Sequence, residues 1–315
     1  SSAAATDAYV LTVTNTNDAP TVSSAIADAS SAEDAAYSLD ISSNFADVDV
    51  GDTLSYAATG MPSTLSMSTA GTLSGTPVNA DVGAHTIIVT ATDSSSAAAT
   101  VTDTFVLTVT NTNDAPTVSS AIADASTAED SAYSLDISGN FADSDVGDSL
   151  SFTASGLPST LSMSSAGAIS GTPVNADVAA HTIIVTATDD SSAAGTVTDT
   201  FVLTVTNTND VPTVSSAIAD ASTDEDAAYS LDVSGNFADV DAADTLSYAA
   251  TGMPSTLSMS TSGTISGTPV NADVGAHTII VTATDSSSAA ATASDTYILT
   301  VTNTNDAPTA TAISD

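Results

Sequence analysis

The chain of 315 residues contains no Lys, Arg, Cys or Trp. Proteins that bind nucleic acids or anionic membrane surfaces neutralise phosphates with Lys and Arg, so neither class of partner is expected here. The absence of Cys excludes disulfides and thiol chemistry, and it is compatible with a long exported protein. No apolar run approaches the roughly 18 residues of a membrane-spanning helix, so no membrane insertion is predicted.

Acidic residues, in contrast, are abundant and have no basic partners. The chain has 38 Asp and Glu residues, three His and a formal net charge of −38. Only Glu33, Glu129 and Glu225 are Glu, and a bias toward the short Asp side chain is typical of turns and of loops that face metal ions. Where these carboxylates lie close together, only cations, backbone N–H groups or water can offset their repulsion.

The hexapeptide at residues 15–20, NTNDAP, recurs three times at a fixed interval. It is found again as NTNDAP at 111–116, NTNDVP at 207–212 and NTNDAP at 303–308, each copy 96 residues after the preceding one. This period is too long for a solenoid repeat and matches one independent domain. We therefore predict three repeats, at 20–115, 116–211 and 212–307. Residues 1–19 match the last strand and linker of a preceding repeat, and residues 308–315 match the start of a following one, as in part of a longer array.

Short alternating runs separated by turn-forming residues predict β-strands throughout each repeat. In the first repeat these runs are 21–27, 36–41, 53–58, 63–68, 72–75, 85–92 and 102–110. No segment keeps an apolar stripe of helical period, so helices are not expected. About seven strands in roughly 100 residues are typical of an immunoglobulin-like Greek-key β-sandwich. We expect an all-β tandem array whose cores combine aliphatic residues with Tyr37, Phe45, Tyr56, Phe105 and their counterparts.

Acids lie in the predicted loops rather than at strand centres. In the first repeat they are Glu33, Asp34, Asp47, Asp49, Asp52, Asp81 and Asp93, and counterparts follow in the later repeats. Hard oxygen ligands without His or Cys favour Ca2+ or Mg2+ over transition metals, and an irregular, loop-built site favours Ca2+. The loop DVDVGD (47–52) also resembles the start of an EF-hand, but its twelfth position is Ala58 instead of Glu and its flanks are predicted strands. We reject the EF-hand alternative.

Three segments resemble cadherin repeats and occur in the same order. VTNTNDAP resembles the cadherin linker D-x-N-D-N-A-P, with one residue missing and Asn in place of the first Asp. Residues 89–109, VTATDSSSAAATVTDTFVLTV, resemble the cadherin segment that carries an A-x-D calcium ligand and continues into the last strand. Residues 45–77 resemble bacterial cadherin-like modules of the dystroglycan type, also described as "putative Ig" modules, of large secreted surface adhesins. The resemblance covers essentially the whole chain.

This resemblance implies that Ca2+ lies between adjacent domains, bound by the bottom of one domain, the linker and the top of the next. For the first junction it implies Glu33, Asp81, Asn111, Asn113, Asp114, Asp143, Asp145 and Asp189. For the second junction it implies Glu129, Asp177, Asn207, Asn209, Asp210, Asp239, Asp241 and Asp285. The same positions at the two ends of the chain are Asn15, Asn17, Asp18, Asp47, Asp49 and Asp93, and Glu225, Asp273, Asn303, Asn305 and Asp306. The shortened linker suggests about one or two ions per junction.

We do not expect enzymatic activity. The three His residues, His85, His181 and His277, are isolated from one another, and we expect them at solvent-facing strand starts. Neither a nucleophile–base pair nor an oxyanion-stabilising cation can be assembled without Cys, Lys or Arg. Paired carboxylates could in principle hydrolyse glycosides, but identical shallow loop sites repeated along a chain are unusual for an enzyme.

Three functions are compatible with the sequence. The leading hypothesis is a calcium-rigidified extender or stalk of a large bacterial adhesin or cell-surface fibre, secreted and extracellular, whose partners are neighbouring repeats of the same protein. A second hypothesis is self-association into a filament, sheath or surface layer. A third is a carbohydrate-binding accessory module, although the chain lacks the Trp platform on which sugars stack.

Overall fold

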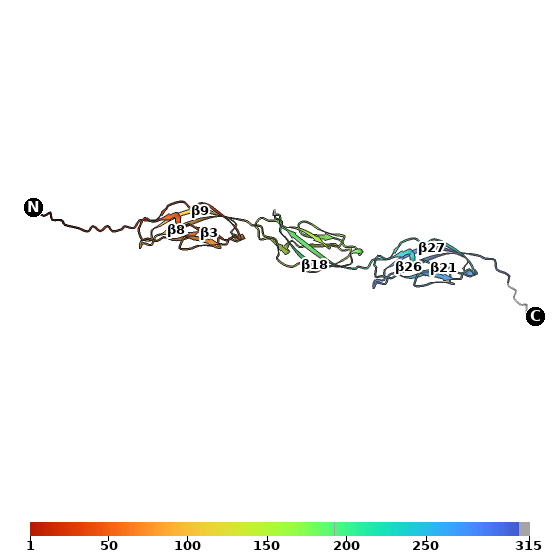
Figure 1. The fold of residues 1–315 in the computed structure, drawn as a ribbon. Helices are drawn as coiled ribbons and strands as arrows, with labels where there is room; N and C mark the ends of the chain where they lie inside the picture. The colour runs from red at the N-terminus through yellow and green to blue at the C-terminus, as the bar shows by residue number, and fades with distance from the viewer. Residues whose placement is uncertain (192, 309–315) are drawn as a thin grey trace, which may run out of the picture.

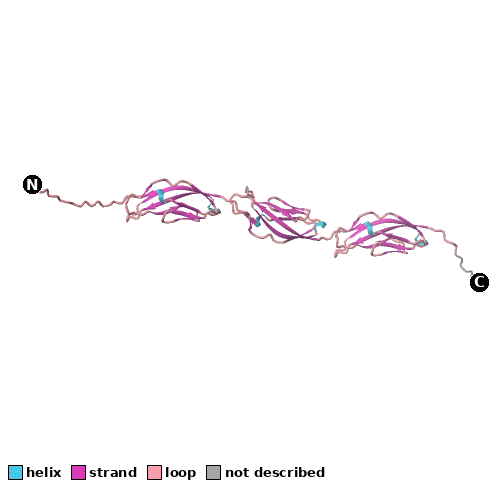
Figure 2. Ribbon diagram, in the orientation of Figure 1, coloured by secondary structure: helices cyan, strands magenta, loops and turns pink. Residues whose placement is uncertain are grey.

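A computed structural model describes residues 1–191 and 193–308. Three similar β units follow one another end to end in an elongated arrangement (Figure 1). Strands dominate each unit, and the helices among the described residues are short 3-10 turns (Figure 2). We call residues 20–115, 116–211 and 212–307 repeats 1, 2 and 3. The all-β fold class is confirmed.

Nine strands and two 3-10 turns recur in each repeat with nearly identical bounds. Repeat 1 contains β1 (Thr21–Val22), β2 (Ala29–Ala32), β3 (Tyr37–Asp40), η1 (Ser42–Asn44), β4 (Phe45–Ala46), β5 (Ser55–Thr59), β6 (Leu65–Met67), β7 (Thr72–Gly75), η2 (Asn79–Asp81), β8 (Gly83–Thr92) and β9 (Thr100–Thr110). Repeat 2 contains β10 (Thr117–Val118), β11 (Ala125–Ala128), β12 (Tyr133–Asp136), η3 (Ser138–Asn140), β13 (Phe141–Ala142), β14 (Ser151–Ser155), β15 (Leu161–Met163), β16 (Ala168–Gly171), η4 (Asn175–Asp177), β17 (Ala179–Thr188) and β18 (Thr196–Thr206). Repeat 3 contains β19 (Thr213–Val214), β20 (Ala221–Asp224), β21 (Tyr229–Asp232), η5 (Ser234–Asn236), β22 (Phe237–Ala238), β23 (Ser247–Thr251), β24 (Leu257–Met259), β25 (Thr264–Gly267), η6 (Asn271–Asp273), β26 (Gly275–Thr284) and β27 (Thr292–Thr302).

Each repeat is a two-layer sandwich. In repeat 1 one layer has the strand order β2-β9-β8-β5, the other has the order β3-β7-β6, and β1 pairs with β4. The long hairpin β8–β9 is antiparallel, whereas β2 runs parallel to β9, with Ala29 opposite Leu107 and Ala32 opposite Thr110. Because β9 leads directly into the linker, this parallel pairing brings the end of β2 to the same end of the repeat as the linker.

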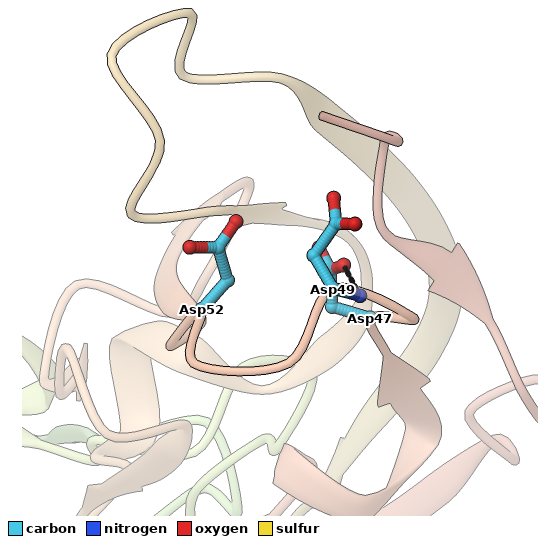
Figure 3. Close-up of side chains that lie close together, drawn as sticks. All are labelled: Asp47, Asp49 and Asp52. Carbon is cyan, nitrogen blue, oxygen red and sulfur yellow. Dashed lines mark hydrogen bonds between the residues drawn. The ribbon is translucent and has the colours of Figure 1, made fainter. Parts of the chain in front are cut away.

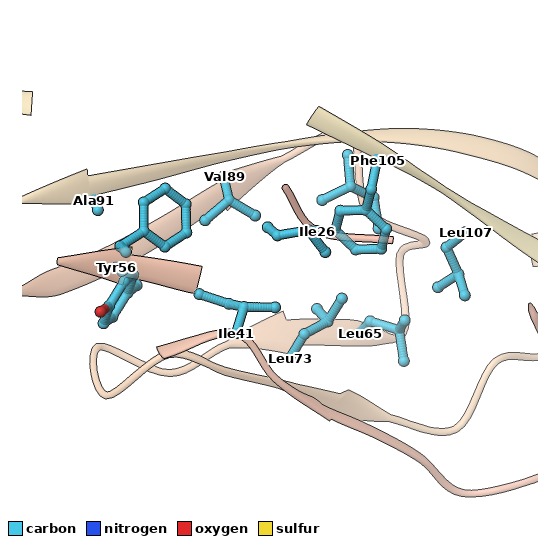
Figure 4. Close-up of a cluster of buried hydrophobic side chains, with 11 residues drawn as sticks. Ile26, Ile41, Tyr56, Leu65, Leu73, Val89, Ala91, Phe105 and Leu107 are labelled. Atoms are coloured by element: carbon cyan, nitrogen blue, oxygen red, sulfur yellow. The ribbon is translucent and has the colours of Figure 1, made fainter. Parts of the chain in front are cut away.

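The core lies between the two layers. It is formed largely by every second residue of β8 and β9, because the side chains of a strand point alternately to its two faces. In repeat 1, Ile87, Val89 and Leu107 are fully buried. Figure 4 shows Val89 and Leu107 pointing into the core. The ring of Phe45 lies 5.7 Å from that of Tyr56, centroid to centroid, and the pair closes one end of the core. The expected aromatic core is confirmed for Phe45, Tyr56 and Phe105, while Tyr37 is only partly buried.

Successive repeats have different orientations about the long axis of the array. In the view of Figure 1, β9 and β27 lie along the upper side of repeats 1 and 3, while β18 lies along the lower side of repeat 2. Adjacent repeats are therefore rotated about the long axis of the array. The described residues contain no helix of the length and hydrophobicity that a membrane span needs.

Several expectations for the elements need correction. The sandwich has nine strands instead of about seven, because β2 and β4 are short additional strands. Only the first two residues of 21–27 form a strand, since the chain then crosses over the core, where the Ile26 N–H donates to Asp103 (2.7 Å). The histidines are not solvent-facing: His85 is partly buried, with its Nε2 atom 2.6 Å from the Asp81 carbonyl oxygen, and His181 and His277 lie in the same way.

The two ends of the chain also differ from the expectation. Residues 1–19, expected to include a last strand, form no strand. Their counterpart β9 is held by β8 and β2, and the described residues contain no counterparts of those two strands for residues 1–19. The expected start of a following repeat at 308–315 lies, apart from residue 308, outside the described residues.

A glycine at the turn after β14 gives a test of the fold. Gly156 has a φ of +81°, and a Cβ atom there would collide with the carbonyl oxygen of Thr182. We expect Gly156→Ala to destabilise repeat 2 by at least about 1–3 kcal/mol, through backbone strain and loss of the close contact. Calorimetry of the whole chain should then show about one third of the unfolding enthalpy shifted to lower temperature, because the three repeats have nearly equal size.

Gly139→Ala is the matched control in the same repeat. Its Cβ would meet nothing within 4 Å, and repeat 1 has Ser43 at this position. Gly139→Ala should therefore leave the transition unchanged. An unshifted transition in Gly156→Ala would contradict the packing described for this turn.

Candidate metal centre

A buried glutamate ties each repeat to the linker that follows it. Glu33 comes directly after β2, is 2% exposed, and accepts the Thr112 N–H with its Oε1 atom (2.9 Å). Glu129 accepts the Thr208 N–H in the same way (2.9 Å). The second carboxylate oxygen, Oε2, of both Glu residues is buried and accepts no hydrogen bond from the described residues. Each glutamate therefore fixes the linker with one oxygen and presents the other oxygen to the junction.

The top of the following repeat holds the linker from the other side. At the first junction Asp145 Oδ2 accepts the Asp114 N–H (2.8 Å), and the carboxylate of Asp189 accepts Asn113 Nδ2 (3.2 Å). The corresponding distances at the second junction are 2.7 Å for Asp210 to Asp241 and 3.1 Å for Asn209 to Asp285. The structure thus brings the predicted linker residues against the predicted acids of the next repeat.

At the second junction the three walls of the predicted site meet. Glu129 from the bottom of repeat 2, Asp210 from the linker and Asp241 from the top of repeat 3 each place a carboxylate oxygen within 4.8 Å of the others. We call these three residues the junction triad. Glu129 and Asp241 are 1% and 3% exposed, so their mutual repulsion is poorly screened by water.

The two junctions differ in one side chain that contacts the linker. The hydroxyl of Ser144 donates to Asp114 Oδ2 (3.0 Å), whereas repeat 3 has Val240 at this position. Among the described residues, Glu33, Asp114 and Asp145 do not gather as closely as the junction triad. The serine holds the linker carboxylate, while the valine leaves the equivalent carboxylate of Asp210 without this donor.

A second group of acids lies in the Asp-rich loop at the top of each repeat. Figure 3 shows Asp47, Asp49 and Asp52 on one loop, where the Asp49 N–H donates to Asp47 Oδ1 (2.9 Å). The equivalent group in repeat 2 is Asp143, Asp145 and Asp148, whereas in repeat 3 Asp239 and Asp244 of the loop lie close to Asp285, which follows β26. Asp52, Asp148 and Asp244 are outside the predicted ligand set, although their place in the motif D-x-D-x-x-D would have indicated them.

The linkers at residues 15–20 and 303–308 each contact a single repeat, so they show which linker contacts form without a second repeat. Asn15 Nδ2 donates to Asp49 (2.9 Å) and Asn17 Nδ2 to Asp93 (3.0 Å), so the first linker docks on repeat 1 without a preceding sandwich. At the other end Thr304 N–H donates to Glu225 (2.8 Å). The first linker asparagines Asn111, Asn207 and Asn303 are exposed, and Asn111 forms no hydrogen bond to the acids among the described residues. The structure does not place Asn111 in the site.

Asp81 and its counterparts Asp177 and Asp273 accept hydrogen bonds from their own repeats. In repeat 1 Asp81 Oδ1 accepts the N–H and hydroxyl of Ser63 (3.0 and 3.2 Å), and Oδ2 accepts the Thr64 hydroxyl and the Val78 N–H (2.6 and 3.2 Å). This carboxylate joins two loops of its own repeat, and the structure does not bring it together with the acids of the junction. Its neighbour Asn79, which the prediction missed, faces the junction instead. The recurrence of N-A-D at 79, 175 and 271 was the available indication.

The loop role of this aspartate is testable in repeat 2. Hydrogen bonds, first of all from the Thr160 hydroxyl, hold the pKa of Asp177 below its usual range. A lowered pKa means that the carboxylate stabilises the fold above the unfolded pKa and that this contribution is lost as the pH falls through the folded pKa, below about pH 4. Asp177→Asn should cost about 1–3 kcal/mol of unfolding free energy at pH 7, because an amide nitrogen would then face hydrogen-bond donors.

Chemical denaturation at pH 7 measures this cost, and Asp130→Asn is the control. Asp130 is exposed in the same repeat, and its positive φ of 57° is one that Asn adopts readily. The control should match the wild type. Equal stability of both variants would show that the carboxylate of Asp177 does not hold the two loops.

The Asp-rich loop of repeat 2 carries uncompensated repulsion. Burial, followed by the charges of Asp190 and Asp145, raises the pKa of Asp148. Repeats 1 and 3 have Ser94 and Ser286 in place of Asp190, and these hydroxyls donate to Asp52 (3.3 Å) and Asp244 (3.1 Å). Repeat 2 thus replaces a hydrogen-bond donor by a second negative charge.

We expect Asp190→Ser to lower the pKa of Asp148 in the presence of EDTA. A raised folded pKa means that the stabilising protonated form is present at acid pH and lost as the pH rises through that pKa, so the variant should be more stable than the wild type near neutral pH. Carboxyl NMR titration of both chains measures the shift. Superimposable titration curves would contradict the repulsion between Asp148 and Asp190.

The donor set fits a hard divalent cation. Among the described residues, the buried oxygens that accept no hydrogen bond at the junctions belong to carboxylates and two amides: Glu33 Oε2, Asn79 Oδ1, Asn113 Oδ1, Asp143 Oδ2, Asp148 Oδ2, Glu129 Oε2 and Asp239 Oδ2. Carboxylate and amide oxygens without nitrogen or sulfur ligands favour Ca2+ or Mg2+. No ligand-sized pocket is found among the described residues.

Comparison with known families identifies the repeats. The family model "Putative Ig domain" matches residues 19–110, 115–206 and 211–302. The chain belongs to this family. Its three Ig domains account for most of the sequence, and their bounds agree with the strands β1 to β9, β10 to β18 and β19 to β27. A comparison with curated proteins gives no match.

The Ig domains of this chain share their fold and tandem arrangement with cadherin extracellular domains. Mouse cadherin-23 EC22-24 is 17% identical with a TM-score of 0.56, over 92% of this chain and 100% of the cadherin chain. Protocadherin gamma B2 extracellular cadherin domains 1-5 are 16% identical with a TM-score of 0.54, over 91% of this chain and 60% of the other. The predicted resemblance to cadherin-like Ig repeats is confirmed at the level of the fold.

Proposed function

We propose that the chain is a calcium-stiffened spacer in a large extracellular protein of a bacterial cell surface, such as an adhesin or a fibre. The observation that carries this proposal is the junction triad, in which Glu129, Asp210 and Asp241 come from three successive segments and converge within 4.8 Å. The chain offers no Lys or Arg to neutralise these carboxylates. A divalent cation is the partner that offsets their repulsion and joins all three segments.

The function of such a junction is mechanical. Ca2+ supplies the positive charge, and the residues of the chain determine what that charge holds. Glu129 already fixes the linker through Thr208, and Asp241 already holds the linker through the Asp210 N–H. Attraction of these carboxylates to a common charge restricts hinging between repeats 2 and 3. A row of such junctions turns a string of domains into a rod.

The near identity of the repeats supports a role that depends on length. Each repeat has the same strand order, and none of the described residues form a pocket that distinguishes one repeat from the others. A spacer needs reach and stiffness rather than a unique recognition surface. Millimolar calcium outside cells would fill sites of modest affinity, which matches the secreted, cell-surface location in this proposal.

Calcium should both stiffen and stabilise the chain. We expect the maximum dimension from small-angle X-ray scattering to be longer and better defined in Ca2+ than in EDTA. The melting temperature should rise with Ca2+, since a ligand at about 100 times its dissociation constant stabilises the folded state by about 2.7 kcal/mol. Identical scattering profiles and melting curves in Ca2+ and EDTA would refute the proposal.

A matched pair of variants tests whether Ca2+ binds at the junction between repeats 2 and 3. Glu129→Gln removes one charge of the junction triad but keeps an oxygen that can accept the Thr208 N–H, and it should weaken Ca2+ binding in isothermal titration calorimetry. Glu225→Gln makes the same change after β20, where the described residues contain no following sandwich. It should change Ca2+ binding less than Glu129→Gln does.

A further inference from the structure

One hydrogen bond at each junction joins two sandwiches directly. Asn79 Nδ2 of repeat 1 donates to Asp145 Oδ1 of repeat 2 (2.8 Å), and Asn175 Nδ2 of repeat 2 donates to Asp241 Oδ1 of repeat 3 (2.9 Å). Among the described residues, all other hydrogen bonds at the junctions begin or end in the linker. We call these two contacts the inter-repeat amide bonds.

The charges around each amide determine its orientation. Asn79 Nδ2 also approaches Asp114 Oδ2 (3.4 Å), and Asn175 Nδ2 approaches Asp210 Oδ2 (3.3 Å). A carboxamide turned the other way would place its oxygen against two carboxylates. The amide group is therefore held with its N–H groups toward the acids, and Asn79 Oδ1 is left buried without a hydrogen bond from the described residues. A donor bonded to a carboxylate forms a charge-assisted bond, which is stronger than a neutral one.

The bottom loop positions the asparagine without help from its amide. Asn79 is the first residue of η2, and the loop around it is closed by Asp81, which binds Ser63, Thr64 and Val78. The Val82 N–H donates to the Asn79 backbone carbonyl (3.1 Å). These contacts leave the side chain of Asn79 to act outside its own repeat, so its replacement should not unfold the loop.

We propose that Asn79 and Asn175 hold adjacent repeats together when no cation is bound. In a chain without Lys or Arg, a neutral donor such as the amide N–H of Asn can bridge two acidic surfaces without an ion. Besides the hydrogen bonds of the linker, each junction then has two attachments between the sandwiches: the inter-repeat amide bond, and the acids that a cation would join. Cation removal leaves the first attachment in place. This inference does not depend on the proposed calcium function.

The absence of Cys allows a direct measurement on the full chain. Ser66 on β6 and Ser162 on β15 are exposed at equivalent positions of repeats 1 and 2, and spin labels on Ser66→Cys and Ser162→Cys report the distance between the two sandwiches. In EDTA, the unaltered junction should give a narrow distance distribution by pulsed electron resonance. With Asn79→Ala, the ratio of docked to open junctions should fall about 10- to 100-fold, as expected for loss of a hydrogen bond to a charged group, and the distribution should broaden.

Asn271→Ala is the matched control. Asn271 occupies the same position in repeat 3, but it donates to Asp306 of the last linker (3.0 Å) and does not contact repeats 1 or 2. Its replacement should leave the distribution narrow. Asn79→Asp, which keeps the size of the side chain and brings a carboxylate to Asp145, should broaden the distribution in EDTA at least as much as Asn79→Ala. Unchanged melting temperatures in all three variants would show that the fold is intact.

Each outcome bears on the inference. A narrow distribution that broadens in Asn79→Ala and Asn79→Asp, but not in Asn271→Ala, supports it. A distribution in EDTA that is already broad without substitution, or that Asn79→Ala leaves unchanged, overturns it. Addition of Ca2+ tests the proposed function separately, because a failure of Ca2+ to narrow the Asn79→Ala distribution would count against the calcium junction and not against the inter-repeat amide bond.

Discussion

The absence of Lys and Arg is the constraint on which this structure depends. A buried carboxylate without a basic partner must be satisfied by N–H and O–H donors, and the loops are built around this need. Asp177 accepts four such donors from its own repeat, and Asp145 accepts a linker N–H and an amide of the preceding repeat. The acids therefore organise the loops and the linker, which in other proteins is often the task of ion pairs.

The number of donors separates acids that build the repeat from acids that face the junction. Asp81, Asp177 and, with fewer bonds, Asp273 are satisfied within one repeat and connect its loops. Glu33 and Glu129 use one oxygen and keep the other buried without a donor. The aspartates and the glutamates both lie at the bottom of the sandwich, so they differ in their hydrogen bonds and not in their location. A carboxylate with one oxygen that accepts no hydrogen bond is better suited to bind a cation than a carboxylate whose oxygens are both bonded.

Much of the architecture follows from local patterns in the sequence, and the failures have identifiable causes. The alternation in HTIIVTAT and TDTFVLTVT predicted β8 and β9, because every second residue of these runs is apolar and buried. Strand β2 was missed because ASSA has no apolar alternation, and it is a strand only through its parallel pairing with β9. In the 3-10 turn N-A-D, successive side chains point about 120° apart, so spacing alone could not show that Asn79, and not Asp81, faces the next repeat. The effect of Ser144 on the linker carboxylate depends on a contact between segments and has no local pattern.

The parallel pairing of β2 with β9 determines how each repeat would respond to tension along the array. The chain enters a repeat ahead of β2 and leaves it from the end of β9, so a pull on the two linkers drags these neighbouring strands in opposite directions along their lengths. The hydrogen bonds between β2 and β9 are therefore loaded in shear. They share the force and must break together rather than one after another. A stalk built from such units would resist stretching at the connection between sandwich and linker, where the load enters.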